Sequence, residues 1–444
     1  MPRLERRGRF CELRRVGSRI TIRRGPIDGS SPATTEVRSG TWASEAVHQL
    51  AGLVDKLIAE GWTLATWRVS AEGLVGEPSP FEVALAGSPR AEDWAVYGDW
   101  LAARGDPRAE LIGLALALDS IDGEGDGDGD AGIRLRREHD ATLDRLRRRW
   151  FGELIELAEL GTVLRWWWSH ARLRELELGG GPGPLDLDLH APNDLAGVLF
   201  DLLAHPSARL LERLALGALD REARRDVARV LEPLAGLQLP ALRRIELGVE
   251  FLRSRTAPVR LGNLAALERL PALRSLRIRG ELVGLPALDR LERLELELPT
   301  IERSLADRLR AGAFPELRRL WIVSERNDPW AALPPAESRA IFERLLARGR
   351  TRELAIQGAT GLHVLLECDD LDRLHELRLV RLRDADAELL LSHADRLAGI
   401  ARLVLDEPAL ERSWERVRER FGDRLQVVRA SFTKVVTATH RQVG

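Results

Sequence analysis

The stretch "LRSLRIRGELVGLPALDRLERLEL", residues 273–296, contains the same six-residue pattern twice. Each copy reads L-x-x-L-x-L, with isoleucine as the last apolar residue of the first copy. Apolar residues at alternating positions are typical of a short strand with one buried face. A pattern that recurs along a chain indicates a repeat architecture, in which each strand packs against its neighbours.

The pattern extends through the C-terminal half of the chain. Clear copies start at Leu173, Leu211, Leu242, Leu273, Leu291, Leu317 and Leu374, and looser copies start at Thr351 and Ile400. Successive copies start 18 to 38 residues apart, and several intervals carry helical patterns. We therefore predict nine parallel strands in an irregular leucine-rich repeat α/β solenoid over residues 164–432. The asparagine that usually follows each copy is missing, so we expect no side-chain ladder at the turns.

The residues between the leucines are expected to line the concave face of this solenoid. One column is Glu175, Arg213, Arg244, Ser275, Arg293, Arg319, Glu353, Glu376 and Arg402, and the next is Glu177, Ala215, Glu246, Arg277, Glu295, Trp321, Ala355, Arg378 and Val404. The centre is basic, at Arg244, Arg277, Arg293 and Arg319, and we expect Trp321 to stand exposed beside these arginines. A solvated charge lattice across the strands is one interpretation. A protein-binding surface is the other, because tryptophan and arginine are common hot-spot residues.

The N-terminal segment is basic and has a strand pattern. Residues 1–24 hold nine arginines against Glu5 and Glu12. Phe10 to Leu13 and the alternation of Ile20 with Ile22 predict two paired strands, and Gly25-Pro26 predicts a turn after the second. An apolar stripe between Ser44 and Gly61 predicts one helix. The segment is expected to be a small β-sheet covered by a helix.

Residues 1–70 resemble the WGR domain, a module of DNA-damage-dependent poly(ADP-ribose) polymerases and of many bacterial multidomain proteins. The resemblance rests on "RFCEL", "RITIRRG", "TTEV", "ASEA" and "DKLIAEGW". It implies nucleic-acid binding, and Arg19, Arg23 and Arg24 are the candidate phosphate contacts. However, Arg24-Gly25-Pro26 replaces the tryptophan-glycine-arginine motif of the family, so a solvated strand face is the competing interpretation.

Residues 78–120 predict short helices. Trp94, Tyr97, Trp100 and Leu101 share one face, Gly105 ends one helix and Asp106-Pro107 begins the next. The string "WAVYGDWLAARGDPRAELIGL" resembles the repeat-companion domain that precedes degenerate leucine-rich arrays, a family without an established activity. Residues 121–132 are rich in glycine and acidic residues, which predicts a flexible linker. The alternating carboxylates also resemble a calcium-binding loop, but Ile133 stands where such a loop needs a bidentate carboxylate. Residues 133–163 predict an amphipathic helical lead-in.

Composition and motifs limit the remaining functions. The chain has 444 residues, a formal net charge of −2 and only two cysteines, and its apolar runs are too short to span a bilayer. We expect a cytoplasmic bacterial protein with neither a membrane association nor a small-molecule substrate. The sequence holds no nucleophile elbow, phosphate loop or metal-binding motif, so we expect no enzyme, cofactor, catalytic residue or metal site. His190 near Asp186, and His363 near Cys368, are isolated histidines.

Together these patterns predict a scaffold protein that binds a partner protein through the solenoid. Nucleic-acid association through the basic N-terminal module is the alternative.

Overall fold

The computed structural model describes residues 3–16, 19–26, 31–39, 63–65, 79–87, 90–123, 129–151, 164–179, 205–217, 227–237, 239–248, 260–324, 328–406 and 412–428, together with isolated residues between these ranges. The chain forms two compact units. The first unit comprises residues 1–224, 233–242 and 249–257, and the second comprises residues 225–232, 243–248 and 258–444. No helix of the described part has the length and apolar character needed to cross a membrane.

The N-terminal residues form a five-stranded antiparallel sheet of order β4-β3-β2-β1-β5. Its strands are β1 (Arg3–Arg6), β2 (Arg9–Val16), β3 (Arg19–Pro26), β4 (Thr34–Ser39) and β5 (Thr63–Ala65). The predicted turn at Gly25-Pro26 is wrong, because both residues belong to β3. Pro26 pairs with Arg9 of β2, and pairing to β4 ends at Arg24, so Pro26 has no second neighbour that needs its missing N–H group. The predicted helix between Ser44 and Gly61 lies almost wholly outside the described residues.

The helical segment of the first unit contains α2 (Pro80–Leu85), α3 (Ala91–Ala102), α4 (Arg108–Gly123) and α5 (Asp130–Phe151). Trp94, Tyr97 and Leu101 are buried on one face of α3, as predicted. Gly105 has a φ of 67°, a left-handed conformation that suits glycine after a helix. Helix α4 extends to Gly123 and α5 begins at Asp130, so the helices enter the predicted linker from both ends.

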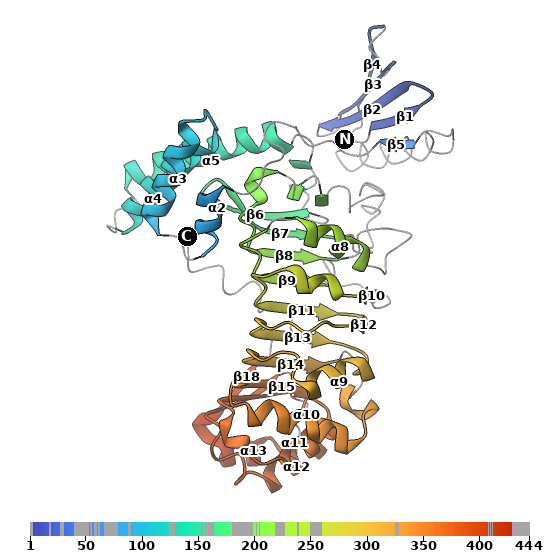
Figure 1. The fold of residues 1–444 in the computed structure, drawn as a ribbon, viewed down its shortest axis with the longest axis vertical. Helices are drawn as coiled ribbons and strands as arrows, with labels where there is room; N and C mark the ends of the chain where they lie inside the picture. Colours follow the sequence, from blue (N-terminus) through green and yellow to red (C-terminus); the bar gives the residue numbers. More distant parts are fainter. Residues whose placement is uncertain are drawn as a thin grey trace. The chain divides into compact units, whose positions relative to one another are not determined.

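The leucine-rich part forms one mostly parallel sheet of eleven strands (Figure 1). The first unit supplies β6 (Leu164–Ser169), β7 (Arg172–Leu178) and β8 (Arg213–Leu216). The second unit supplies β9 (Arg244–Leu247), β11 (Ser275–Arg279), β13 (Arg293–Glu297), β14 (Arg319–Val323), β15 (Glu353–Gln357), β16 (Glu376–Val380), β17 (Arg402–Asp406) and β18 (Leu425–Val428). All nine predicted strands are therefore confirmed. Strand β6, antiparallel to β7, and β18, parallel to β17, complete the sheet.

The register of the sheet brings the predicted columns together. Ser275 pairs with Arg244 and Arg293, and Arg293 pairs with Arg319. The leucines of the repeated pattern, such as Leu276 and Leu294, are completely buried. Because the leucines stand at equivalent alternating positions in every strand, their side chains all point to one face of the sheet. The side chains of the residues between them point to the other face.

The second unit also contains the helices α9 (Arg303–Ala311), α10 (Pro335–Ala347), α11 (Ala359–Leu366), α12 (Asp384–Ser392) and α13 (Trp414–Phe421). Helix α8 (Ala228–Gly236) precedes β9, and a parallel pair, β10 (Arg260–Asn263) and β12 (Glu281–Gly284), flanks β11. Short 3-10 turns, Pro206–Ala208, Ala265–Arg269, Pro329–Ala332, Leu371–Arg373 and Gly422–Arg424, connect other elements.

Arginines bind carbonyl groups at the ends of three helices of this part. Arg348 donates to the carbonyl of Gly312 after α9, at 3.0 Å. Arg373 donates to Ala347 at the end of α10, at 2.9 Å, and Arg396 to Cys368 after α11, at 2.7 Å. The last carbonyls of a helix lack intrahelical partners and carry partial negative charge, which a guanidinium satisfies. These bonds lie at helix ends, whereas the expected absence of an asparagine ladder concerns the turns after the strands and stays a prediction.

Candidate functional site

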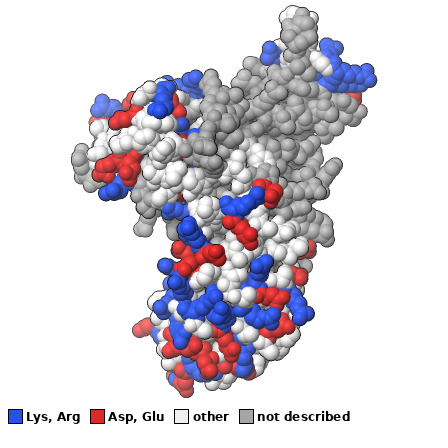
Figure 2. All heavy atoms as spheres, viewed as in Figure 1, with Lys and Arg blue, Asp and Glu red and all other residues white. Residues whose placement is uncertain are grey.

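The candidate site is the face of the second unit's strands opposite to the leucines, called here the strand face. It is formed by Arg244, Glu246, Ser275, Arg277, Arg293, Glu295, Arg319, Trp321, Glu353, Glu376, Arg378 and Arg402. Acidic and basic side chains are interleaved over the surface of this unit (Figure 2). The strand face is therefore a charged surface built on a rigid sheet.

At two places on the strand face a buried carboxylate lies beneath a more exposed arginine. The Glu246 side chain is 2% exposed, whereas that of Arg244, whose Nε lies 2.8 Å from Glu246 Oε1, is 42% exposed. The Glu376 side chain is 7% exposed, and that of Arg402, at 3.1 Å, is 46% exposed. Long arginine stems reach across the sheet while their charged ends stay near water. At these two places the outermost group is therefore a guanidinium ion bound to a buried carboxylate.

Trp321 is buried, with 7% of its surface exposed, so the expectation of an exposed Trp321 is wrong. The Arg319 guanidinium carbon lies 5.2 Å from the indole centroid and that of Arg378 lies 4.6 Å from it. The register partner of Trp321 on β15 is Ala355, whose small side chain leaves room for Arg378 to reach in from β16. Cation–π contacts with these two arginines therefore explain why a tryptophan lies among the charged side chains of the strand face.

Arg293 is the exception in this layer. Its neighbour Arg319 contacts Glu353 and lies 3.9 Å from Glu295, and Arg378, further along the sheet on β16, lies 3.4 Å from both Glu376 and Asp406. Arg293 is exposed, and no described residue forms an ion pair with it. Its register partners are Ser275 and Arg319, a neutral residue and a like charge.

In the first unit, the corresponding face of β6 to β8 carries an exposed tryptophan. Trp167 is 37% exposed, while Trp166 and Trp168 contact Phe151, with ring centroids 5.3 and 5.8 Å away. Arg213 lies 6.0 Å from the Trp167 ring centroid and is held by Glu177 at 2.7 Å. Strand alternation places Trp167 on the face opposite to Trp166, but alternation alone does not give its exposure.

The three N-terminal arginines do not form one patch. Consecutive residues of a strand point to opposite faces, which separates Arg23 from Arg24. Arg23 lies over the Phe10 ring, 5.6 Å from its centroid, and Arg24 is 3.7 Å from the Glu36 carboxylate. The side chain of Arg19 lies outside the described residues. A Cβ at Gly25 would approach both Ala33 and Phe10 to 3.1 Å, so close packing accounts for the one retained motif residue.

The helical segment holds a buried polar cluster around Glu82. The Glu82 carboxylate accepts hydrogen bonds from the Tyr97 hydroxyl at 2.8 Å and from Arg209 at 3.1 Å, and Arg108 lies 3.7 Å away. Arg108 also forms a forked pair with Asp106 at 2.7 to 3.1 Å. Burial disfavours the charged form of Asp106, but these bonds to Arg108 hold its pKa below the usual range. Three residues that carry the resemblance to the repeat-companion domain therefore have a structural role in this cluster: Tyr97, Asp106 and Arg108.

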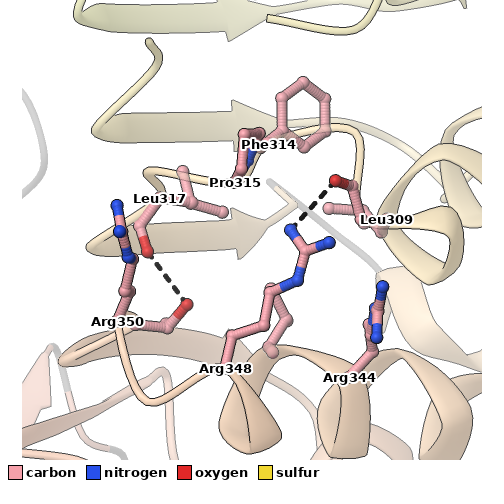
Figure 3. Close-up of a pocket in the computed structure, with 10 residues that line it drawn as sticks. Leu309, Phe314, Pro315, Leu317, Arg344, Arg348 and Arg350 are labelled. Atoms are coloured by element: carbon pink, nitrogen blue, oxygen red, sulfur yellow. Dashed lines mark hydrogen bonds between the residues drawn. The ribbon is translucent and has the colours of Figure 1, made fainter. Parts of the chain in front are cut away.

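One shallow depression lies where α9 and β14 meet α10 and β15 (Figure 3). Leu309, Phe314, Leu317 and Leu345 form its apolar lining. Two of its polar groups bond to the chain itself, because Arg348 donates to the carbonyl of Gly312 and the Thr351 hydroxyl to that of Leu317 at 3.1 Å. The depression is explained as a junction between successive repeats.

The two histidines singled out in the sequence are His363 and His190. No group of three potential ligands occurs among the described residues. His363 pairs with Glu367 at 3.2 Å on the exposed side of α11, and Cys368 is buried, which raises the pKa of its thiol to about 11. His190 and Asp186 lie outside the described residues.

Comparisons with known proteins give no family. No model of a known protein family matches the chain, and no curated protein matches it. A structural-genomics crystal structure of a protein from Bacteroides fragilis has 14% sequence identity and a TM-score of 0.43, covering 97% of this chain and 96% of that one. A likeness of this degree carries no functional conclusion.

Proposed function

We propose that this protein is an interaction scaffold that binds an acidic segment of a partner protein through the strand face. In this proposal the second unit belongs to a leucine-rich repeat solenoid, and the strand face is its concave surface. The WGR-like and repeat-companion segments are further modules of the same scaffold.

The unpaired charge of Arg293 is the observation that carries the proposal. Like charges on adjacent strands destabilise a sheet, and Arg293 lies beside Arg319 without a carboxylate of its own among the described residues. A position that breaks the local pairing rule is expected where function requires it. A carboxylate of a partner would complete the lattice at Arg293.

The surrounding arginines make such a contact favourable. Buried carboxylates such as Glu246 and Glu376 hold their arginines before any ligand arrives. Ordering a side chain in advance lowers the entropy cost of binding. A planar guanidinium also pairs with carboxylates through two parallel hydrogen bonds.

A displayed random peptide library selected on the full chain tests the proposal. We expect enrichment of peptides with clustered aspartate and glutamate. Their affinity should fall at least about tenfold in Arg293→Gln, because charged interface anchors contribute roughly 2 kcal/mol or more. Arg310→Gln is the matched control, since Arg310 is exposed on α9 and already paired with Asp307. Selected peptides without acidic bias, or with equal affinity for both variants and the wild type, would refute the proposal.

A further inference from the structure

The turn between β6 and β7 has an unusual backbone. His170 and Ala171 have φ values of 47° and 59°, and they connect Ser169 to Arg172. Two-residue hairpin turns with positive φ at both positions strongly favour Asn-Gly or similar pairs, because other residues are strained there. Strained backbone that the surrounding structure maintains is concentrated at functional sites.

The side chains at this turn form a hydrogen-bonded relay. Ser169 Oγ lies 2.9 Å from His170 Nδ1, and His170 Nε2 lies 3.0 Å from Asp119 Oδ2 of α4. The Asp119 carboxylate accepts the Nε2–H hydrogen, which leaves the lone pair of the neutral ring on Nδ1. Nδ1 therefore accepts the hydrogen of the Ser169 hydroxyl. This order of groups is the one by which histidine activates a serine.

The surroundings fix the imidazole in this orientation. The Trp94 ring stacks on it, with centroids 4.9 Å and planes 16° apart, and Arg172 lies over Trp94 at 5.0 Å. Burial lowers the pKa of His170, which outweighs the opposite effect of Asp119. The ring is therefore neutral at neutral pH and able to accept a proton.

The chain contains a natural control for this arrangement. Ser392 and His393 repeat the same dipeptide, with Ser392 Oγ 2.9 Å from His393 Nδ1. Nδ1 of His393 also lies 3.0 Å from the Leu389 carbonyl, and no described carboxylate pairs with the ring. The Ser392 hydroxyl donates its hydrogen to the same Leu389 carbonyl at 2.8 Å. Of these two serine–histidine pairs, the one at Ser392 therefore lacks both the hydrogen bond to an accepting imidazole and a described carboxylate partner.

We propose that Ser169 is a nucleophile, with His170 as its general base and Asp119 as the group that orients the base, and that this site transfers acyl groups from small esters to water. Ser169 Oγ bonds to the carbonyl carbon while His170 Nδ1 takes its proton. The bond to the leaving oxygen then breaks, and the alcohol departs with that proton. Water then gives a proton to His170 as its oxygen bonds to the acyl carbon. The bond between that carbon and Ser169 Oγ breaks, Oγ takes the proton back from His170, and a carboxylic acid is released.

This site goes beyond the proposed scaffold function and rests on different residues. It also departs from the expectation that the chain is not an enzyme. That expectation rested on short sequence motifs, and no short motif contains both Asp119 and His170, which are 51 residues apart.

Labelling of the full chain with a fluorophosphonate tests the proposal. The reagent forms a bond from serine Oγ to phosphorus and releases fluoride, while the proton passes to histidine. Mass spectrometry of the wild type should find Ser169 labelled at least about tenfold faster than Ser392. Asp119→Asn should slow labelling at Ser169 on the order of a hundredfold, because the amide favours the wrong tautomer. Ser392→Ala should leave it unchanged.

Turnover of p-nitrophenyl acetate gives a second measurement. We expect release of nitrophenolate by the wild type and by Ser392→Ala, and loss of it in Ser169→Ala, a change that removes one oxygen. Equal labelling of the two serines in the wild type, or unchanged turnover in Ser169→Ala, would overturn the proposal. His170 would then be a structural pin that joins the hairpin to the helical segment.

Discussion

Two pairs of arginines, one pair from each unit, have contrasting environments. In the first unit Arg108 and Arg213 are buried and face carboxylates on more than one side. In the second unit Arg244 and Arg402 lie above their carboxylates, and Arg293 has no described carboxylate partner. Burial and pairing, more than residue type, therefore separate a structural arginine from one available to a ligand. This distinction matters in a chain whose basic residues are almost all arginine.

The largest effect is expected where the buried cluster of the first unit is broken. Glu82→Ala leaves Arg108 and Arg209 without their shared carboxylate, so we expect a loss of about 3–5 kcal/mol in the free energy of unfolding. Urea denaturation followed by circular dichroism measures it. Glu110→Ala is the control, because its pair with Arg145 is exposed, and it should cost less than about 1 kcal/mol. Equal losses of unfolding free energy in the two variants would contradict the contrast between buried and exposed ion pairs.

The buried His205 should make the first unit sensitive to acid. Burial, and then the charge of Arg108, lower its pKa to about 4, below the unfolded value of roughly 6.5. The folded state therefore resists protonation of His205. The contribution of the neutral ring to the free energy of unfolding is fully present above about pH 6.5 and is lost as the pH falls to about 4. The loss should approach about 3 kcal/mol in unfolding experiments across this range. His205→Gln should flatten the profile, and an unchanged profile would contradict the assignment.

In the second unit, Arg319→Gln should cost about 1–2 kcal/mol of unfolding free energy. Arg319 contacts Glu353 and covers one face of Trp321, so its loss leaves a partly buried carboxylate unpaired. A double-mutant cycle with Glu353→Gln should give a coupling of roughly 0.5–1 kcal/mol. A coupling of zero would contradict the interpretation that the charged residues of the strand face stabilise one another.

Arg24 provides the smallest expected change. Because Arg24 is paired with Glu36, Arg24→Gln should alter binding of labelled duplex DNA by less than about twofold, as judged by fluorescence anisotropy. Arg23→Gln is the comparison, since Arg23 lies on the opposite face of the strand. A large loss in Arg24→Gln would favour the nucleic-acid alternative.

The columns of the sheet were predictable, whereas the environment of single side chains was not. The leucine phase determines the register, which places Arg244, Ser275 and Arg293 side by side. The burial of Trp321 depends on Arg378, two strands further along the sheet, and no local pattern contains that contact. The relay at Ser169 likewise needs Asp119 from a helix distant in sequence. Local periodicity encodes strands and faces, and tertiary contacts decide exposure and pairing.

The stability of Arg293→Gln tests the central claim most directly, because the claim is that this arginine serves a ligand and not the fold. Equilibrium unfolding should show a variant as stable as the wild type, or more stable by up to about 0.5 kcal/mol, since repulsion from Arg319 is relieved. A loss of more than about 1 kcal/mol would show that Arg293 is part of the structural lattice and would contradict the claim.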